Sequence, residues 1–365
     1  MKLKIGYVSP DFRTHSVAYF LEPLLKSHNK ENFELFGYYN NSKQDETNSR
    51  LKSYFDHWEE VEGLSDEDLA DKIYNDQVDI LVDLAGHSAN NRLAVLAQKP
   101  APIQATWLGY PNTSGLSTID YRITDEIADP SGESEPFNTE KLIRLENGFL
   151  CYQGDKDVPA IHELPYDRNG YFTFGSFNNY VKVTPEVISV WSEILKAVER
   201  SRLILKSNQL GDAMTSARCL ALFAAHDIKP ERITLCGMIP NNADHLAYYG
   251  EVDLALDPFP YNGTTTTFEA LWMGVPTLTL KGKVHASRVG ASILSRIGLH
   301  SYVAGTVEEY VKIAQSKSQA LEELRILRRD LRQQMINSSL CDSADFAKQI
   351  EKAYAFMWKT YRESV

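Results

Sequence analysis

The chain has 365 residues, of which 43% are hydrophobic and 24% charged. This composition is typical of soluble globular proteins and excludes disordered, fibrous and membrane-spanning chains. At roughly 100–200 residues per domain, the length predicts two domains. The 38 Lys and Arg residues against 49 Asp and Glu residues give a net charge of −11. Because no basic run accompanies it, we expect neither nucleic acid nor an anionic membrane as a partner.

The cysteines and the apolar stretches indicate where the protein works. Four cysteines are scattered without a CxxC pair or the spacing of metal ligands, namely Cys151, Cys219, Cys236 and Cys341. We expect buried thiols in a reducing compartment and no metal site. The apolar run before Pro10 is too short for a signal peptide, and no stretch approaches the ~20 apolar residues of a membrane-spanning helix. The predicted location is cytoplasmic.

Short apolar runs alternate with segments of helical period in the first half of the chain. The runs predict strands at residues 3–8, 33–38, 78–84, 103–108, 121–124 and 142–145. The helical segments lie at residues 16–26, 66–74 and 91–98. This alternation is typical of a parallel α/β sheet and predicts a Rossmann-like domain over residues 1–160.

The same pattern recurs in the second half. It predicts strands at residues 172–177, 202–206, 232–236, 254–257 and 277–280. It also predicts helices at residues 185–198, 212–225, 244–249, 266–273 and 286–296. A second Rossmann-like domain is therefore expected over residues 171–342.

Two further segments complete the organisation. Residues 153–170 are rich in Gly, Pro and charge and have no strand or helix period, which predicts an interdomain linker. In residues 343–365, the apolar Phe346, Ile350, Tyr354 and Phe356–Met357 recur at helical spacing. They predict a C-terminal helix that crosses back and packs on the N-terminal domain.

In open parallel sheets, ligands bind beyond the carboxyl ends of the strands. His15 lies in the loop after the first predicted strand, in the run SPDFRTH. An imidazole there can act as acid, base or phosphate donor. The alternative is a histidine that only caps the following helix.

Two further loops in the first half are rich in polar groups. Asp83 ends a buried strand and His87 follows it in a Gly-His-Ser turn, so both side chains could reach one site. The alternative for Asp83 is that it accepts hydrogen bonds from backbone amides of its own loop. Residues 107–115 combine glycines, a proline and hydrogen-bonding side chains in a loop that could contact a sugar or a peptide.

The second half contains cues for a diphosphate. Thr184 followed by Pro185 predicts a helix start, so Lys182 and the preceding Asn178 and Asn179 lie in a strand-to-helix loop. Helix N-termini favour anions, and a lysine at this position suits a diphosphate. The alternative is a solvated surface lysine.

A second strand-to-helix loop contains Gly263 followed by four threonines, Thr264, Thr265, Thr266 and Thr267. Their hydroxyls and backbone N–H groups predict a phosphate cradle without a Walker lysine. Glu269 can accept hydrogen bonds from ribose hydroxyls. Alternatively, Thr266 and Glu269 form a capping box, since they fit its S/T-x-x-E spacing.

These cues together predict a GT-B glycosyltransferase, with two Rossmann-like domains and a cleft between them. The chain resembles glycosyltransferase family 41, which contains the animal O-GlcNAc transferase and the plant SPINDLY protein. The resemblance rests on ordered segments from Ile5 to Ser292: GYVSPDFRTH, DILVDLAGHSANN, PAPIQATWLGYPNTSG, DYRITD, FGSFNNYVKVTP, LDPFPYNGTTTTFEALWMGVPTLTL and HASRVGAS.

The resemblance implies an inverting, metal-independent transfer of a sugar from a nucleotide sugar to Ser or Thr of a protein or peptide. The N-terminal domain would be the acceptor side and the C-terminal domain would bind the nucleotide sugar. His15 matches the family's active-site histidine, and Lys182 the lysine that neutralises the leaving diphosphate. The remaining matched positions would hold the nucleotide, namely Asn179, Gly263–Thr267, Glu269 and, in the base-binding segment, His245.

The chain departs from the family in two ways. It carries none of the TPR repeats that generally precede this region, so a separate TPR-containing partner could deliver the acceptor. It also has Asn262-Gly263-Thr264 where the O-GlcNAc transferase type has Asn-Gly-His. This change resembles the SPINDLY type, whose plant member uses GDP-fucose, so GDP-fucose and UDP-GlcNAc both remain possible donors.

Two alternative functions are a GT-B enzyme for small molecules or glycans and a non-catalytic nucleotide-sugar-binding scaffold. The presence of both His15 and Lys182 favours an enzyme, in which Asp83 and His87 are the next candidates for a general base.

Overall fold

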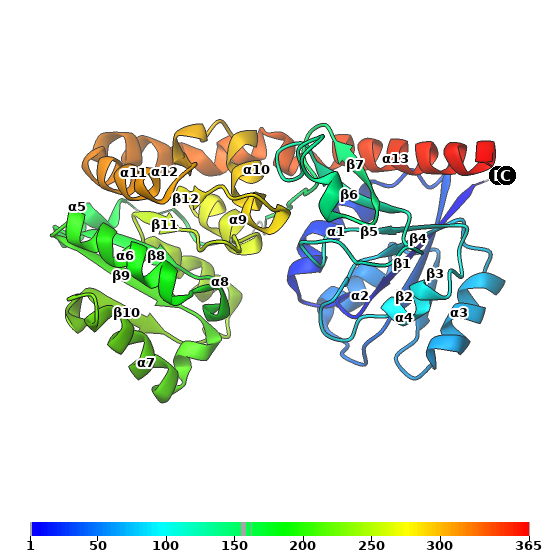
Figure 1. Ribbon diagram of the computed structural model, residues 1–365, viewed down its shortest axis with the longest axis horizontal. Coiled ribbons are helices and arrows are strands. Elements are labelled where there is room, and N and C mark those ends of the chain that lie inside the picture. Colours follow the sequence, from blue (N-terminus) through cyan, green and yellow to red (C-terminus); the bar gives the residue numbers. More distant parts are fainter. Residues whose placement is uncertain (1, 155–157, 162, 365) are drawn as a thin grey trace. The chain divides into compact units, whose positions relative to one another are not determined.

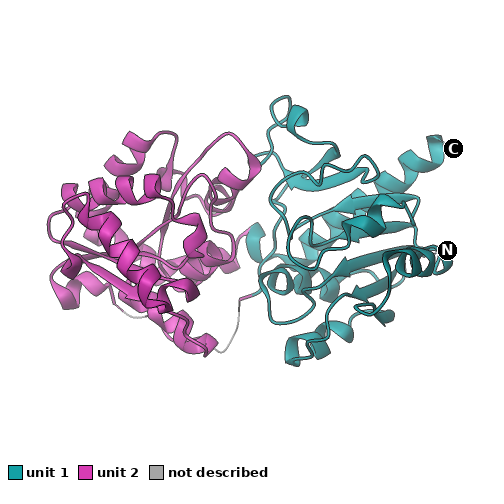
Figure 2. Ribbon diagram, turned by 60° about the horizontal axis from the view of Figure 1, so that its bottom comes forward, with its two compact units in different colours: residues 1–153, 339–365 teal, residues 154–338 magenta. Residues whose placement is uncertain are grey.

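The computed structural model describes residues 2–154, 158–161 and 163–364. The chain divides into two compact units, shown in Figure 2. Unit 1 comprises Met1–Gln153 and Ser339–Val365, and unit 2 comprises Gly154–Ser338. Each unit is an α/β fold with helices around a parallel sheet (Figure 1).

The sheet of unit 1 has seven strands in the order β3-β2-β1-β4-β5-β6-β7, and all neighbouring pairs are parallel. The strands are β1 (Leu3–Ser9), β2 (Phe33–Tyr39), β3 (His57–Glu60), β4 (Ile80–Asp83), β5 (Ile103–Thr106), β6 (Tyr121–Asp125) and β7 (Lys141–Leu145). The strand order reverses between β1 and β4. At that point the loops after two adjacent strands diverge, which is where open α/β sheets bind ligands.

The helices of unit 1 are α1 (Ser16–Ser27), α2 (Glu46–Lys52), α3 (Asp66–Asn75), α4 (Leu93–Ala97) and α13 (Ser343–Ser364). The C-terminal helix α13 packs against α1. Its buried stripe includes Phe346, Ile350, Tyr354 and Met357, whereas Phe356 is exposed, unlike the sequence expectation. The Tyr7 hydroxyl links β1 to this helix, since it lies 3.0 Å from the Tyr354 hydroxyl.

The sheet of unit 2 has six strands in the order β10-β9-β8-β11-β12-β13, again all parallel. The strands are β8 (Phe172–Ser176), β9 (Ser201–Lys206), β10 (Ile233–Cys236), β11 (Leu254–Leu256), β12 (Thr277–Leu280) and β13 (Val303–Ala304). The order reverses between β8 and β11, as it does between β1 and β4 in unit 1. The prediction of two Rossmann-like sheets is confirmed.

The helices of unit 2 are α5 (Pro165–Asn169), α6 (Pro185–Ala197), α7 (Ala213–Ala224), α8 (Asn242–Ala247), α9 (Thr265–Trp272), α10 (Val289–Arg296), α11 (Val307–Gln319) and α12 (Leu321–Ile336). The start of α6 is as predicted, because the Thr184 hydroxyl accepts a hydrogen bond from the Val187 N–H at 3.3 Å and Pro185 occupies the first turn.

The structure corrects several expectations. The predicted linker, residues 153–170, contains α5, although residues 155–157 and 162 lie outside the described residues. The sequence did not predict the edge strands β3 and β13 or the helix α2. The sequence of β3 has no alternation of apolar and polar residues, and β13 is only two residues long. All four cysteines are free, but two of them, Cys236 and Cys341, are only half-buried.

Candidate functional site

In unit 2, the loops after β8 and β11 meet at the point where the strand order reverses. The two strands are hydrogen-bonded neighbours, and both loops lead into helices at the carboxyl edge of the sheet. A direct bond joins the loops, because the Thr266 hydroxyl donates to Asn178 Oδ1 at 2.8 Å. The structure therefore brings together the two diphosphate cues that were separate in the sequence.

Gly263 allows this close approach. A Cβ at this position would lie 2.6 Å from Thr266 Oγ1, 2.7 Å from Asn178 Oδ1 and 3.0 Å from Thr267 Oγ1. The Gly263 N–H donates to Asp257 Oδ1 at 2.6 Å, and this bond ties the loop to the end of β11. Any larger residue would push apart the side chains that hold the two loops together.

The N-terminus of α9 is available to an anion. Within the described residues, Thr264, which precedes the helix, forms no side-chain cap. The Thr267 N–H bonds to the Thr264 carbonyl at 3.1 Å. The N–H groups that begin a helix have no acceptor four residues earlier within it, so this end of α9 favours a negatively charged ligand. The capping-box alternative is wrong, because Thr266 bonds to Asn178 and Glu269 contacts residues of another helix. The hydroxyl of Thr267 is buried and has no hydrogen-bond partner among the described residues.

Lys182 ends the short 3₁₀ helix η2 (Tyr180–Lys182), and its ammonium is held beside this loop. Its Nζ donates to the carbonyl of Asn262 at 2.7 Å and lies 3.7 Å from the centroid of the Tyr261 ring. Burial lowers the pKa of Lys182 to about 8, and the negative charge of Asp257 opposes the shift. The alternative of a solvated surface lysine is therefore wrong.

Asp257 is the buried carboxylate behind this lysine, with 1% of its surface exposed. Burial raises its pKa, whereas the hydrogen bonds from Gly263 and Thr279 and the charge of Lys182 lower it. The Thr279 hydroxyl donates to Asp257 Oδ2 at 2.7 Å. Asp257 thus both orders the loop and partly offsets the charge of Lys182.

Asn179 lies at the exposed end of the same loop. Its Oδ1 accepts hydrogen bonds from the Val181 N–H at 3.1 Å and from Gln209 Nε2 at 2.9 Å. Its side chain therefore caps η2 and connects it to η3 (Asn208–Gly211). Its neighbour Asn178 is buried and faces Gly263.

His245 and Glu269 lie together in the structure. His245 Nε2 lies 3.0 Å from Glu269 Oε2, and the Tyr249 hydroxyl donates to the same oxygen at 3.2 Å. Since a carboxylate only accepts, the Nε2 atom of His245 carries the proton in this pair. Glu269 is buried, with 8% of its surface exposed.

In unit 1, His15 is the N-cap of α1. Its Nδ1 accepts a hydrogen bond from the Val17 N–H at 3.3 Å and lies 3.5 Å from Asp11 Oδ2. The side chain is 38% exposed. Burial lowers the pKa of His15, and the charge of Asp11 opposes this shift. The capping alternative agrees with the observed contacts of His15. Within the described residues these contacts involve Nδ1 and leave Nε2 for another group.

Asp83 and His87 lie close enough for their charges to interact, but each is held by contacts of its own. Asp83 is 1% exposed and accepts hydrogen bonds from the N–H groups of Ala85 and Gly86 and from the Thr106 hydroxyl. The alternative of a loop-holding carboxylate is therefore the observed one, and burial raises the pKa of Asp83. His87 is exposed, and its Nε2 lies 2.7 Å from the Ser114 carbonyl oxygen.

The loop at residues 107–115 is held by Glu140, which the sequence did not indicate. Glu140 accepts from the Thr113 hydroxyl at 2.7 Å and from the Ser114 N–H at 2.7 Å. Gly109 packs on the backbone, because a Cβ there would lie 1.8 Å from the Leu84 carbonyl oxygen. Much of the polarity of this loop therefore holds the loop itself.

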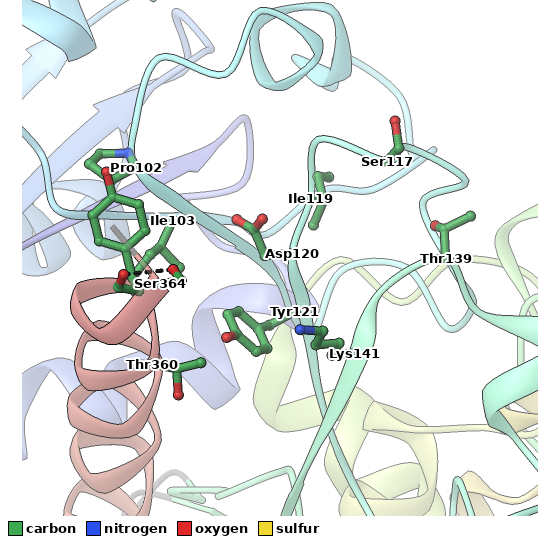
Figure 3. Close-up of a pocket in the computed structure, with 11 residues that line it drawn as sticks. Pro102, Ile103, Ser117, Ile119, Asp120, Tyr121, Thr139, Lys141, Thr360 and Ser364 are labelled. Atoms are coloured by element: carbon green, nitrogen blue, oxygen red, sulfur yellow. Dashed lines mark hydrogen bonds between the residues drawn. The ribbon is translucent and has the colours of Figure 1, made fainter.

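A separate pocket of about 320 Å³ lies at the amino ends of β5, β6 and β7, beside the last turn of α13 (Figure 3). Its lining includes Asp120, Tyr121, Lys141 and Thr360. Asp120 already contacts the Lys99 ammonium and accepts from the Gln104 N–H at 2.7 Å. Because this is the opposite edge from the His15 loop, the pocket is not part of the candidate site.

Among the residues that the structure describes, no group of three or more His, Cys, Asp or Glu side chains could hold a metal ion. Over the same residues, no helix is long and apolar enough to cross a membrane.

Comparison with known proteins identifies the family. The chain matches the family described as Glycosyl transferase family 41 over residues 1–165 and 160–350. The chain belongs to this family. It is 43% identical to a protein of Petunia hybrida named "probable UDP-N-acetylglucosamine–peptide N-acetylglucosaminyltransferase SPINDLY", over 99% of this chain and 39% of that protein. It is 31% identical to the corresponding SEC protein of Arabidopsis thaliana, over 99% of this chain and 37% of that protein.

A solved structure agrees with this assignment. The O-GlcNAc transferase mutant of Thermobaculum terrenum matches with a TM-score of 0.95 and 38% identity, over 100% of this chain and 69% of that chain. The predicted family, the closer likeness to the SPINDLY type and the GT-B fold class are confirmed. The chain spans about two fifths of the length of the curated relatives it matches.

Several residues at the carboxyl edge of the unit 2 sheet were not singled out from the sequence. Lys206 and Asp257 lie at the ends of β9 and β11, so the rule that places ligands at the carboxyl edge could have found both. Phe177 and Tyr261 also lie in loops after strands, but their aromatic side chains gave no chemical cue, and Tyr249 lies in the 3₁₀ helix η5 (Tyr248–Glu251). Their role depends on which loops the fold brings together.

Proposed function

We propose that the chain is the catalytic region of an inverting protein O-glycosyltransferase, which moves a sugar from a nucleotide sugar to Ser or Thr of a protein. The observation that carries the proposal is the ammonium of Lys182, held beside the Gly263 loop and the uncapped N-terminus of α9. The family membership and the names of the relatives support it.

Lys182 and α9 would act on the leaving diphosphate. As the glycosidic bond breaks, negative charge develops on the diphosphate oxygen. A preorganised ammonium and helix N–H groups in a half-buried site stabilise that charge more than water does. On this proposal the reaction needs no metal ion, because these groups supply the positive charge.

In unit 1, we assign to His15 a hydrogen bond rather than proton abstraction. Because Nδ1 accepts from the Val17 N–H, the neutral imidazole carries its proton on Nε2. An Nε2–H group donates to an oxygen of the reacting groups. The residue that removes the proton of the acceptor hydroxyl stays unassigned.

Two donors are proposed. The names of the relatives specify UDP-N-acetylglucosamine, whereas the resemblance to the SPINDLY type implies GDP-fucose. The acceptor is a protein or peptide, and a separate TPR-containing polypeptide would present it. This last point is proposed because the relatives extend well beyond the part that this chain matches.

The test is a transfer assay with the purified chain, an acceptor protein and each donor separately, read by intact-protein mass spectrometry and by release of UDP or GDP. We expect addition of N-acetylhexosamine or deoxyhexose, and unchanged transfer in the presence of a chelator. Release of nucleotide without modified protein, or modification of a small glycan alone, would contradict the protein acceptor.

A matched pair of glycine variants ties the activity to the site. Gly263→Ala places a Cβ against Thr266 and Asn178, so we expect roughly tenfold weaker donor binding, the loss of about one hydrogen bond to a charged group. Gly63→Ala, where nothing lies within 4 Å of the added Cβ, is the control. Equal donor affinity in both variants would show that the nucleotide binds elsewhere.

A further inference from the structure

Lys206 is a half-buried lysine that the proposed transfer reaction does not use. It is the last residue of β9, next to β8 and on the same carboxyl edge as Lys182. Burial lowers the pKa of Lys206, and the charge of Glu269 opposes this shift. In the described part of the chain, no acceptor lies within hydrogen-bond distance of its Nζ. The donor capacity of this half-buried ammonium is therefore free for a ligand.

The surroundings of Lys206 are aromatic. Its Nζ lies 5.8 Å from the centroid of the Phe177 ring. The same ring lies 5.4 Å from the ring of Tyr248, with an interplanar angle of 18°, and 6.2 Å from the ring of His245. Such stacked rings with a few polar atoms suit a flat heterocycle.

His245 offers the opposite hydrogen-bonding character to Lys206. Its Nε2–H donates to Glu269, so Nδ1 of the neutral ring bears a lone pair. Nδ1 is buried and has no hydrogen-bond partner within the described ranges. Lys206 and His245 thus share two neighbours, Phe177 and Glu269, and provide one unused donor and one unused acceptor.

The position of these groups relative to the diphosphate cues indicates which part of a nucleotide they would contact. The Gly263 loop follows β11 and Lys182 follows β8, whereas Lys206 ends β9 and His245 follows β10. The strand order is β10-β9-β8-β11. A nucleotide whose diphosphate lies at β8 and β11 therefore extends its nucleoside toward β9 and β10.

We infer that Lys206, with His245, selects nucleotides whose base presents a carbonyl oxygen beside a ring N–H. Uracil and guanine have this edge, with an acceptor oxygen that suits an ammonium and an N–H that suits an imidazole lone pair. Adenine and cytosine present an amino group in place of that oxygen. An ammonium cannot accept a hydrogen bond from it. Lys206 is a specificity-determining residue for keto bases.

This inference rests on the proposed nucleotide-sugar donor, and its test separates the two. Binding of UDP, CDP, GDP and ADP to the full chain is measured by calorimetry. Within each base class, the pairs UDP/CDP and GDP/ADP differ at the carbonyl position. We expect the wild-type chain to prefer the keto member of the pair it binds, roughly 10- to 100-fold, the range for one hydrogen bond to a charged group.

Two variants of Lys206 and one control variant test whether Lys206 causes the keto preference. Lys206→Met keeps the length and apolar stem of the side chain. We therefore expect the keto preference to fall at least fivefold, with little change in the affinity for ADP or CDP. Lys206→Arg should restore most of it. Lys229→Met, at an exposed lysine of unit 2, should change nothing.

Each other outcome counts against the inference. If Lys206→Met weakens all four nucleotides equally, the lysine acts on the phosphates. If its keto preference equals that of the wild-type chain, another group selects the base. If the wild-type chain binds nucleotides without such a preference, Lys206 does not select keto bases. If the wild-type chain binds none of the four, the proposed donor itself is wrong.

Discussion

The two units use the same anchor at the carboxyl edges of their sheets. In unit 1, the Asp83 carboxylate accepts from the Gly86 N–H at 2.8 Å and from the hydroxyl of Thr106, on the neighbouring strand β5. In unit 2, Asp257 accepts from the Gly263 N–H at 2.6 Å and from the hydroxyl of Thr279, on the neighbouring strand β12. Each Asp lies at the end of the strand where the order reverses.

The difference lies in the loop of the adjacent strand. After β8 that loop brings Lys182 next to Asp257, and the anchored glycine leads into the uncapped end of α9. The corresponding loop after β1 contains Asp11, Arg13 and His15, and His15 caps the helix that follows. A strand-end aspartate is thus a structural element in both units, and the neighbouring loop decides whether it also serves an anion site.

The largest expected effect is that of Lys182→Ala. The charge it offsets develops on the leaving diphosphate, so its loss should cost about 3 kcal/mol in the transition state, or roughly a hundredfold or more in rate. The measurement is kcat together with the midpoint of thermal unfolding, which we expect to stay near wild type. Near-normal turnover in the folded variant would remove Lys182 from the reaction.

The pH profile sharpens this assignment. The pKa of Lys182 is lowered to about 8, so its positive charge is present below that pH and lost above it. We expect kcat/KM to fall as the pH rises through about 8. In Lys182→Arg the fall should disappear, since arginine stays charged. A profile that Lys182→Arg leaves unchanged would assign the titration to another group.

Replacing the strand-end aspartate should have different effects in the two units. Asp83→Asn and Asp257→Asn each leave a buried donor without its acceptor, which costs about 2–3 kcal/mol of stability. Only Asp257→Asn removes a negative charge near Lys182, so it should also lower the pKa of that lysine and reduce transfer at pH 7.5. Its activity should partly return at lower pH, where Lys182 is protonated again.

Chemical unfolding and transfer assays on the two variants at several pH values check this comparison. Loss of transfer in Asp83→Asn at a temperature where it is folded would give that residue a role in the reaction. Equal transfer by both variants would mean that Asp257 does not act on Lys182.

The smallest expected effect concerns His15. His15→Ala removes the cap of α1 and should cost about 1 kcal/mol of stability, whereas His15→Asn keeps a good capping residue. Both remove the Nε2–H group, so both should reduce transfer by roughly tenfold, the loss of one hydrogen bond to a charged group. If only the alanine variant is affected, and only in stability, His15 is a capping residue alone.

The sequence predicted much of this protein because its elements have strong local signals. The apolar runs at β1, β2, β6, β8 and β12 lie within two residues of the observed strands, since a buried parallel strand needs a continuous apolar run. Thr184 and Pro185 predicted the start of α6, because a threonine N-cap followed by a proline in the first turn is a local signal. By contrast, the edge strand β3 has little apolar pattern, because it forms by pairing with β2.

For the site, the sequence by itself determined which loops follow strands and which of them carry lysine, histidine and glycine. Tertiary structure decided how each polar side chain is used. Asp83 and Asp257 look alike in sequence as strand-end aspartates. In the structure Asp257 interacts with Lys182, which lies in the 3₁₀ helix after β8, far earlier in the chain. Likewise, Lys206 became a candidate only when packing placed it against Phe177 without an acceptor. Hydrogen-bond satisfaction depends on neighbours distant in the chain, which no local pattern encodes.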